Sequence, residues 1–170
     1  MATHFVYLAN TSGLKVGITR GTQTPTRWMD QGATQALPIY QVSTRLISGL
    51  IETTLTDHIA DKTNWRALLK GDNDTLDLPT SRDELKLQIS DQVEKIKQEW
   101  PDEIIKEIDS DVLTFNYPVN EFPEEIISHN FDKNPSVCGI LNGVKGQYLL
   151  LDTGVINIRK FTGYEVSVST

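Results

Sequence analysis

Two apolar segments joined by a short turn, near the N-terminus, most constrain the fold of this chain. FVYLAN (residues 5–10) and LKVGITR (residues 14–20) lie on either side of Thr-Ser-Gly. Each segment is rich in β-branched and aromatic residues, and the turn contains glycine, which together predict a β-hairpin. The next residues, 24–32, predict a short helix with Thr24 as its cap and Pro25 in its first position. Trp28 is expected in the core.

A third strand and a longer helix follow this short helix. LPIYQVST (residues 37–44) alternates like a strand, and residues 45–62 have apolar side chains at helical spacing. The spacing predicts one buried stripe, formed by Ile47, Leu50, Ile51, Leu55 and Ile59. Gly49 lies inside this helix, where glycine costs about 1 kcal/mol relative to alanine, so a close approach to another element is expected there. Residues 1–71 therefore predict a compact α/β unit.

The remainder of the chain contains first a polar and acidic helical segment and then a segment rich in predicted strands. Residues 72–111 contain a polar connector and an acidic amphipathic helix over 81–99, whose apolar face is expected to cover a core. Residues 112–170 predict a short strand at 115–119 and then an antiparallel meander of four strands, drawn from segments 136–140, 146–152, 154–160 and 163–169. The predicted fold class is α+β: a small three-stranded sheet flanked by helices, then the acidic helix, then a C-terminal β-meander.

Charge and composition limit the classes of partner. The net charge is −7, yet residues 1–70 carry seven Lys/Arg against four Asp/Glu. A partner that carries phosphate is therefore compatible with the N-terminal unit, although the chain as a whole is acidic. No apolar run reaches the roughly 20 residues that span a bilayer, so no membrane partner is expected. Cys138 is the single cysteine and is expected to be a small buried hydrophobe, and the expected compartment is the cytoplasm.

Four residues in the N-terminal unit fall in an order that resembles the GIY-YIG endonuclease superfamily. Tyr7 stands in the first half-motif and Lys15-Val16-Gly17 in the second, followed by Arg27 in a helix and Glu52 in a later helix. The resemblance implies a small three-stranded sheet flanked by helices and cleavage of nucleic-acid phosphodiesters. It also implies that Tyr7, Lys15, Arg27 and Glu52 are catalytic and that Glu52 holds Mg²⁺.

The chain as a whole resembles a bacterial family of uncharacterised proteins, domain-of-unknown-function family 2797. The resemblance covers essentially the whole chain and rests on VYLANTSGLKVGITR, PTRWMDQGA, DKTNWRALLKG, SHNFDK and KGQYLLLDTGVINIRK. Members of that family usually carry a cysteine-rich segment, thought to bind zinc, before the hairpin. This sequence has no such segment.

The residue types fit phosphodiester chemistry on physical grounds as well. Arg27 offers a permanently charged fork that matches phosphate oxygens. Glu52 borders the predicted buried stripe and can hold one Mg²⁺ that keeps most of its waters. The hydroxyl of Tyr7 can orient water or phosphate. An exposed surface glutamate is the alternative interpretation of Glu52.

Lys15 and Gln31 depart from the superfamily pattern. The superfamily commonly has tyrosine at the position of Lys15, where it is thought to act as the general base. A lysine with the ordinary pKa of about 10.4 is a cation at neutral pH, which binds phosphate but takes no proton. Gln31 stands where some relatives have tyrosine or histidine. Two functions therefore remain open: a Mg²⁺-dependent endonuclease and a nucleic-acid-binding module that lacks catalysis.

The candidate nucleic-acid-binding residues are Lys15, Arg20, Arg27, Trp65 and Arg66. Trp65 fits either base stacking or packing between a helix and a loop. The meander also carries bases among aromatic residues, a pattern that fits single-strand binding or ordinary solvent exposure; these bases are Lys145, Arg159 and Lys160. A third function is a protein-interaction domain that uses the acidic helix.

Overall fold

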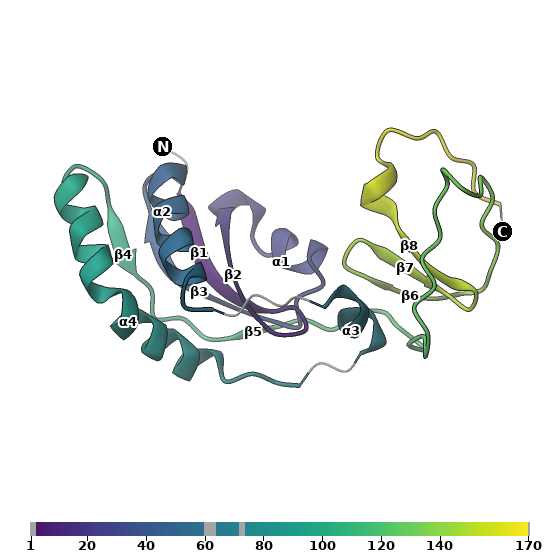
Figure 1. Ribbon diagram of the computed structural model, residues 1–170, viewed down its shortest axis with the longest axis horizontal. Coiled ribbons are helices and arrows are strands. Elements are labelled where there is room, and N and C mark those ends of the chain that lie inside the picture. Colours follow the sequence, from purple (N-terminus) through teal and green to yellow (C-terminus); the bar gives the residue numbers. More distant parts are fainter. Residues whose placement is uncertain (1–2, 60–63, 72–73, 170) are drawn as a thin grey trace.

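The computed structural model describes residues 3–59, 64–71 and 74–169, and its first sheet begins with the predicted hairpin (Figure 1). β1 (His4–Asn10) pairs antiparallel with β2 (Leu14–Arg20) on one side and with β3 (Gln35–Val42) on the other. Two short strands that the sequence did not predict, β4 (Ile105–Glu107) and β5 (Leu113–Thr114), both pair with β3. β2 is therefore left at the free edge of this sheet.

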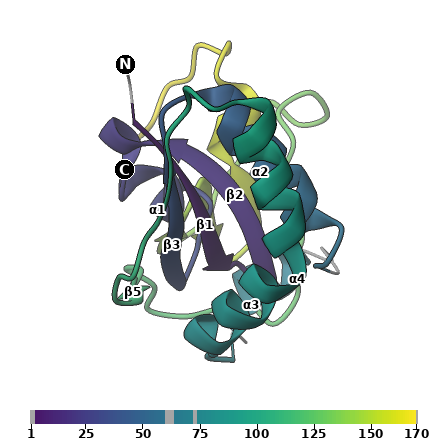
Figure 2. The same ribbon diagram turned by 90° about the vertical axis from the view of Figure 1, so that its left-hand side faces the viewer.

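Helices cover both faces of the first sheet. α2 (Arg45–Thr56) and α4 (Leu78–Glu99) lie on one face, and the short α1 (Thr26–Asp30) lies on the other (Figure 2). The predicted stripe is confirmed at Ile47, Ile51 and Leu55, which are fully buried. Residues 60–62 of the predicted helix lie outside the described residues, and α2 ends earlier, at Thr56.

Gly49 corrects one prediction about α2. In the described part of the chain, no atom of another element lies within 4 Å of where a Cβ would stand at Gly49. The expected close approach is therefore wrong. Ile47 and Ile51, two positions before and after Gly49, lie on the opposite side of the helix and are the buried ones.

α4 has the predicted amphipathic character. Asp77 caps its start by accepting a hydrogen bond from the backbone N–H of Thr80 at 3.1 Å. The apolar face enters the same core as α2 and the first sheet, with these residues buried: Leu85, Ile89, Val93 and Ile96. The charged face remains in solvent, where Lys86 pairs with Glu107 of β4 at 2.9 Å. No helix in the described residues is both long and apolar enough to cross a membrane.

The C-terminal sheet has three strands instead of the expected four. It consists of β6 (Leu141–Lys145), β7 (Tyr148–Leu151) and β8 (Gly154–Asn157), followed by the 3-10 helix η2 (Ile158–Phe161). The outer edge of β8 is occupied by residues 127–129, and the edge of β6 by residues 118–120. Segments 136–140 and 163–169 therefore find no free edge to pair with and form no strands. Cys138, expected to be buried, is exposed.

The two sheets meet through α1, α3 (Trp65–Lys70) and the turn between β6 and β7 (Figure 1). Gly146 of that turn has φ +58°, and a Cβ there would stand 2.8 Å from the backbone nitrogen of Gly32 and 2.9 Å from the carbonyl oxygen of Asp30. The hydroxyl of Tyr117 donates to the carbonyl of Ala33 at 2.8 Å. The fold is thus the predicted α+β class, with its second sheet fixed against the C-terminal end of α1.

Candidate functional site

The glycine of the Lys-Val-Gly motif makes room for a tyrosine on the neighbouring strand. Tyr7 of β1 lies directly opposite Gly17 of β2. A Cβ on Gly17 would stand 2.7 Å from both Cζ and Oη of Tyr7, so the ring lies across the glycine. Trp28 of α1 holds the ring from the side in an edge-on contact, with centroids 5.5 Å apart. The two half-motifs therefore form one packed unit, and Trp28 is in the core as predicted.

The hydroxyl of Tyr7 is a hydrogen-bond donor at neutral pH. It donates to Oε1 of Gln31, just after α1, at 3.1 Å. Burial raises the pKa of Tyr7 above its ordinary value of 10, while the nearby guanidinium of Arg27 lowers it less strongly. The phenol therefore keeps its proton and offers a hydrogen bond rather than a base.

Glu52 of α2 lies at the edge of the same site, half-buried and surrounded by positive charge. Burial raises the pKa of its carboxyl group, and the cations of Arg45, Lys15 and Arg27 act in the opposite direction. The carboxylate of Glu52 in turn raises the pKa of Tyr7. We call Tyr7, Lys15, Arg27 and Glu52 the tyrosine–glutamate cluster, because Glu52 interacts electrostatically with each of the other three.

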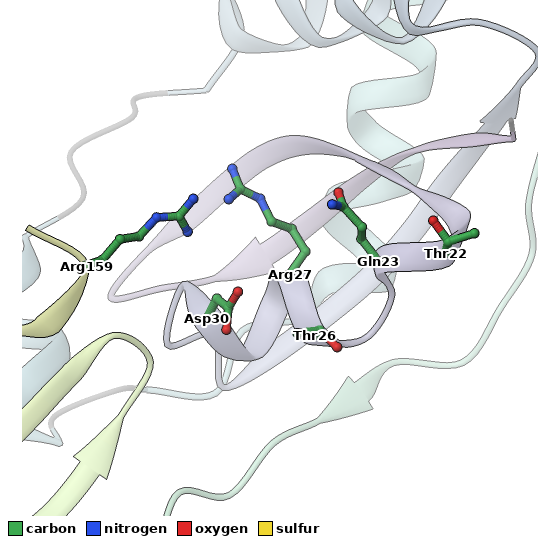
Figure 3. Close-up of a pocket in the computed structure, with 6 residues that line it drawn as sticks. All are labelled: Thr22, Gln23, Thr26, Arg27, Asp30 and Arg159. Atoms are coloured by element: carbon green, nitrogen blue, oxygen red, sulfur yellow. The ribbon is translucent and has the colours of Figure 1, made fainter. Parts of the chain in front are cut away.

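Arg27 also lines a pocket. The pocket has a volume of about 250 Å³ and is lined by Thr22, Gln23, Thr26, Arg27, Asp30 and Arg159 (Figure 3). The guanidinium groups of Arg27 and Arg159 point toward one another across it, and Asp30 contributes a carboxylate (Figure 3). Arg159 comes from η2 in the C-terminal half of the chain. We call this the arginine pocket.

A family model described as "Protein of unknown function (DUF2797)" matches residues 1–166. The chain belongs to the DUF2797 family. The family membership expected from the sequence is thereby confirmed. No curated protein matches, and no solved structure does.

The remaining predicted residues lie away from the cluster of this DUF2797 chain. Arg20 is exposed at the end of β2, and the alternation of the strand places it on the face opposite Gly17. Trp65 stacks on Tyr148 with ring planes 6° apart and centroids separated by 6.0 Å. The guanidinium carbon of Arg66 lies 4.6 Å from the Trp65 ring centroid. Trp65 thus packs α3 against the second sheet.

Sequence reasoning missed Arg45 and the position of Arg159. Arg45 precedes Glu52 by seven residues on one helix, two turns apart, so helical spacing was an available signal for this pair. Arg159 is 132 positions after Arg27, and no local pattern connects the two. Its neighbour Lys160 does not line the arginine pocket, and its ammonium lies 5.6 Å from the Phe161 ring centroid.

A metal ion would have one carboxylate ligand in this DUF2797 site. Within residues 3–59, 64–71 and 74–169 there is no group of three or more His, Cys, Asp or Glu side chains that could enclose a metal. Glu52 offers a single half-buried carboxylate. That donor set fits Mg²⁺, which keeps several waters and is often bound through one or two carboxylates together with substrate phosphate.

Proposed function

We propose that this protein acts on nucleic acid as a Mg²⁺-dependent phosphodiesterase of GIY-YIG type. The tyrosine–glutamate cluster carries the proposal: three elements, the β1–β2 hairpin, α1 and α2, supply a tyrosine, two cations and a carboxylate to one site. The resemblance to the GIY-YIG superfamily implies a site made of these residues, in this order along the chain. The net charge of −7 makes such a concentration of positive charge a local feature of this surface.

The chain's own residues supply binding and orientation. Arg27 presents a charged fork to the phosphate oxygens, and Lys15 adds a second positive charge beside it. The hydroxyl of Tyr7, held by Trp28 and donating its single proton to Gln31, can accept a hydrogen bond from the attacking water and so orient it. Neither step requires these residues to gain or lose a proton.

Glu52 is the residue that would hold Mg²⁺. Its half-buried carboxylate interacts electrostatically with Arg27 and Lys15, so an ion there would act on a phosphate bound by these cations. When bound, Mg²⁺ supplies charge stabilisation at the phosphoryl oxygens and a more acidic water.

A nucleic-acid-binding module without catalysis is the second candidate. The raised pKa of Tyr7 favours it, because the tyrosine holds its proton and is a poor general base. Lys15 also stands where the superfamily commonly has its proton acceptor. This candidate keeps the roles of Arg27 and Lys15 as phosphate ligands.

Cleavage and binding assays on matched variants separate the two candidates. Labelled single-stranded, duplex and branched DNA and RNA are incubated with Mg²⁺ or Mn²⁺. Glu52→Gln is expected to lower the cleavage rate by about 100-fold or more while affinity is kept. Arg27→Gln is expected to weaken binding and to reduce the salt slope of the affinity by about one. Glu84→Gln, an exposed carboxylate on α4, is the matched control.

The outcomes assign the function. Cleavage that depends on Glu52 but not on Glu84 supports the phosphodiesterase. Binding that depends on Arg27 without any cleavage rejects the enzyme and supports the binding module. Equal behaviour of Arg27→Gln and the wild type would reject both, because the cluster would then not contact the phosphate backbone.

A further inference from the structure

The arginine pocket joins two halves of the molecule that are far apart in the sequence. Arg27 comes from α1 beside the first sheet, and Arg159 from η2 beyond the second sheet. Their guanidinium groups face each other (Figure 3), and in the described part of the chain neither takes part in an ion pair. Two like charges that converge on one pocket repel each other, and an anion between them removes that repulsion.

The position of Arg159 is set by its surroundings on the second sheet. The backbone N–H of Ile158 donates to the carbonyl of Gln147 at 2.9 Å, and Asn157 caps the backbone N–H of Lys160 at 3.3 Å. Phe161, at the end of η2, is buried. The backbone contact of Gly146 with the end of α1 then fixes this sheet against the helix that carries Arg27. Arg159 is thus brought to the pocket by folded structure on both sides.

A second hollow with mostly apolar walls adjoins the arginine pocket. It has a volume of about 370 Å³ and shares Asp30 and Arg159 with that pocket. Its apolar side chains come from the second sheet and η2: Val144, Tyr148, Leu149 and Ile158. This volume falls in the range of about 300–1,000 Å³ that is typical of sites for small organic groups. We call it the apolar hollow.

We propose that the two adjoining pockets form a subsite for one nucleotide of a single-stranded segment, with its phosphate between Arg27 and Arg159 and its unpaired base in the apolar hollow. The subsite rests on the proposed function, since Arg27 also belongs to the tyrosine–glutamate cluster. Arginine forks bind phosphate through paired hydrogen bonds, and bases gain stability on aromatic and apolar surfaces. Asp30 lines both pockets, so two arginines and one aspartate leave the arginine pocket with a net charge of +1, which still favours phosphate there.

An affinity assay on three variants tests this subsite. The probe is a 5′-fluorescein dT₁₀ strand, compared with the same strand in a ten-base-pair duplex, with Ca²⁺ in place of Mg²⁺ to prevent cleavage. Arg159→Gln is expected to weaken single-strand binding by about 10-fold and to lower its salt slope by about one. Ile158→Ser is expected to weaken single-strand binding by about 3-fold with an unchanged salt slope, because it alters only the base contact. Lys160→Gln, the adjacent cation outside both pockets, is expected to bind like the wild type.

Several results would overturn the subsite. Equal affinities for Arg159→Gln and Lys160→Gln would remove Arg159 from the phosphate contact. An equal loss of single-strand and duplex binding in Arg159→Gln would leave a general backbone contact with no base pocket. In both cases cleavage or binding that depends on Glu52 and Arg27 would still support the proposed function. If the wild type bound neither the single strand nor the duplex, the subsite would also be rejected.

Discussion

The two sheets differ in how their strands are held together. The first sheet is packed on one face against α2 and α4, in a cluster of sixteen buried hydrophobic residues within the described part of the chain. Among the described residues, the corresponding cluster at the second sheet contains only Leu69, Leu150 and Val155, and Leu69 belongs to α3 rather than to the sheet. A sheet with so few buried side chains gains little stability from its own core.

The two sheets contribute different parts of the candidate site. The first sheet and its two helices α1 and α2 hold the tyrosine–glutamate cluster, whose geometry depends on the larger core. The second sheet contributes Arg159 and the apolar hollow, and it does so through its contacts with α1 and α3. We therefore expect the cluster to tolerate changes in the second sheet, whereas the second sheet depends on the first.

Truncation of one core residue in each sheet tests this dependence most strongly. Ile51 and Leu150 are both fully buried. Ile51→Ala is expected to lower the free energy of unfolding by about 3–4 kcal/mol, and Leu150→Ala by about 2–3 kcal/mol, because the smaller cluster can collapse around the gap. Urea denaturation followed by circular dichroism measures both values.

The two substitutions should also differ in their effects on cleavage and on single-strand binding. Ile51→Ala is expected to impair cleavage and single-strand binding together, whereas Leu150→Ala is expected to impair only the binding that depends on Arg159. Leu46→Ala, at a half-exposed position of α2, is the control and should change the free energy of unfolding by less than about 1 kcal/mol. A loss of Glu52-dependent cleavage in Leu150→Ala would contradict the proposed division between the sheets.

Gly146→Ala tests the contact between the sheets without touching either core. Its Cβ would meet backbone atoms of Asp30 and Gly32 at 2.9 Å or less, and φ at this residue is +58°. We expect a loss of about 1–3 kcal/mol in the free energy of unfolding, and weaker single-strand binding because Arg159 moves away from Arg27. Thermal melts and fluorescence anisotropy measure the two effects.

Gly163→Ala is the matched control for this substitution. Residue 163 follows η2, and no described atom lies within 4 Å of a Cβ placed there. It should leave both measurements near the wild-type values. If Gly146→Ala behaved like Gly163→Ala, the turn between β6 and β7 would not be what fixes the second sheet against α1.

Local patterns were sufficient for the three longer strands of the first sheet, β1, β2 and β3, but not for its short strands β4 and β5 or for the edges of the second sheet. The hairpin, the third strand and α4 follow from apolar spacing, because each buries a whole face against one core. Segment 163–169 also alternates like a strand, but Val166 and Val168 are exposed because residues 127–129 already occupy the edge of β8. Pairing of strands depends on which edge is free, and that is decided by distant parts of the chain.

The same limit applies to the site. Tyr7, Lys15, Arg27 and Glu52 were named from motif order, and in the structure Glu52 interacts electrostatically with the other three. Gly17 needed the register of β1 and β2 before its role beside Tyr7 was visible. Arg159 reaches Arg27 through the docking of a second sheet, a tertiary contact that no spacing rule encodes.

Removing the charge of Glu52 gives the smallest expected change in the free energy of unfolding. It tests whether the charged cluster destabilises the fold. The pKa of Glu52 is raised above its ordinary value of 4.5, mainly by burial. The folded state therefore binds the proton more tightly than the unfolded state does. The stability from this group is fully present below pH 4.5 and is lost as the pH rises through the folded-state pKa.

Glu52→Gln, a neutral side chain of the same shape, should avoid that loss. We expect the variant and the wild type to have nearly equal unfolding free energies at pH 4, and the variant to be more stable at pH 7. The difference should stay below about 1 kcal/mol, because the carboxylate is only half-buried and solvent screens it. Urea denaturation at both pH values measures it, with Glu84→Gln as the exposed control. A less stable Glu52→Gln at pH 7 would mean that Arg45, Lys15 and Arg27 stabilise the carboxylate more than burial penalises it, so that the cluster strengthens the first sheet instead of weakening it.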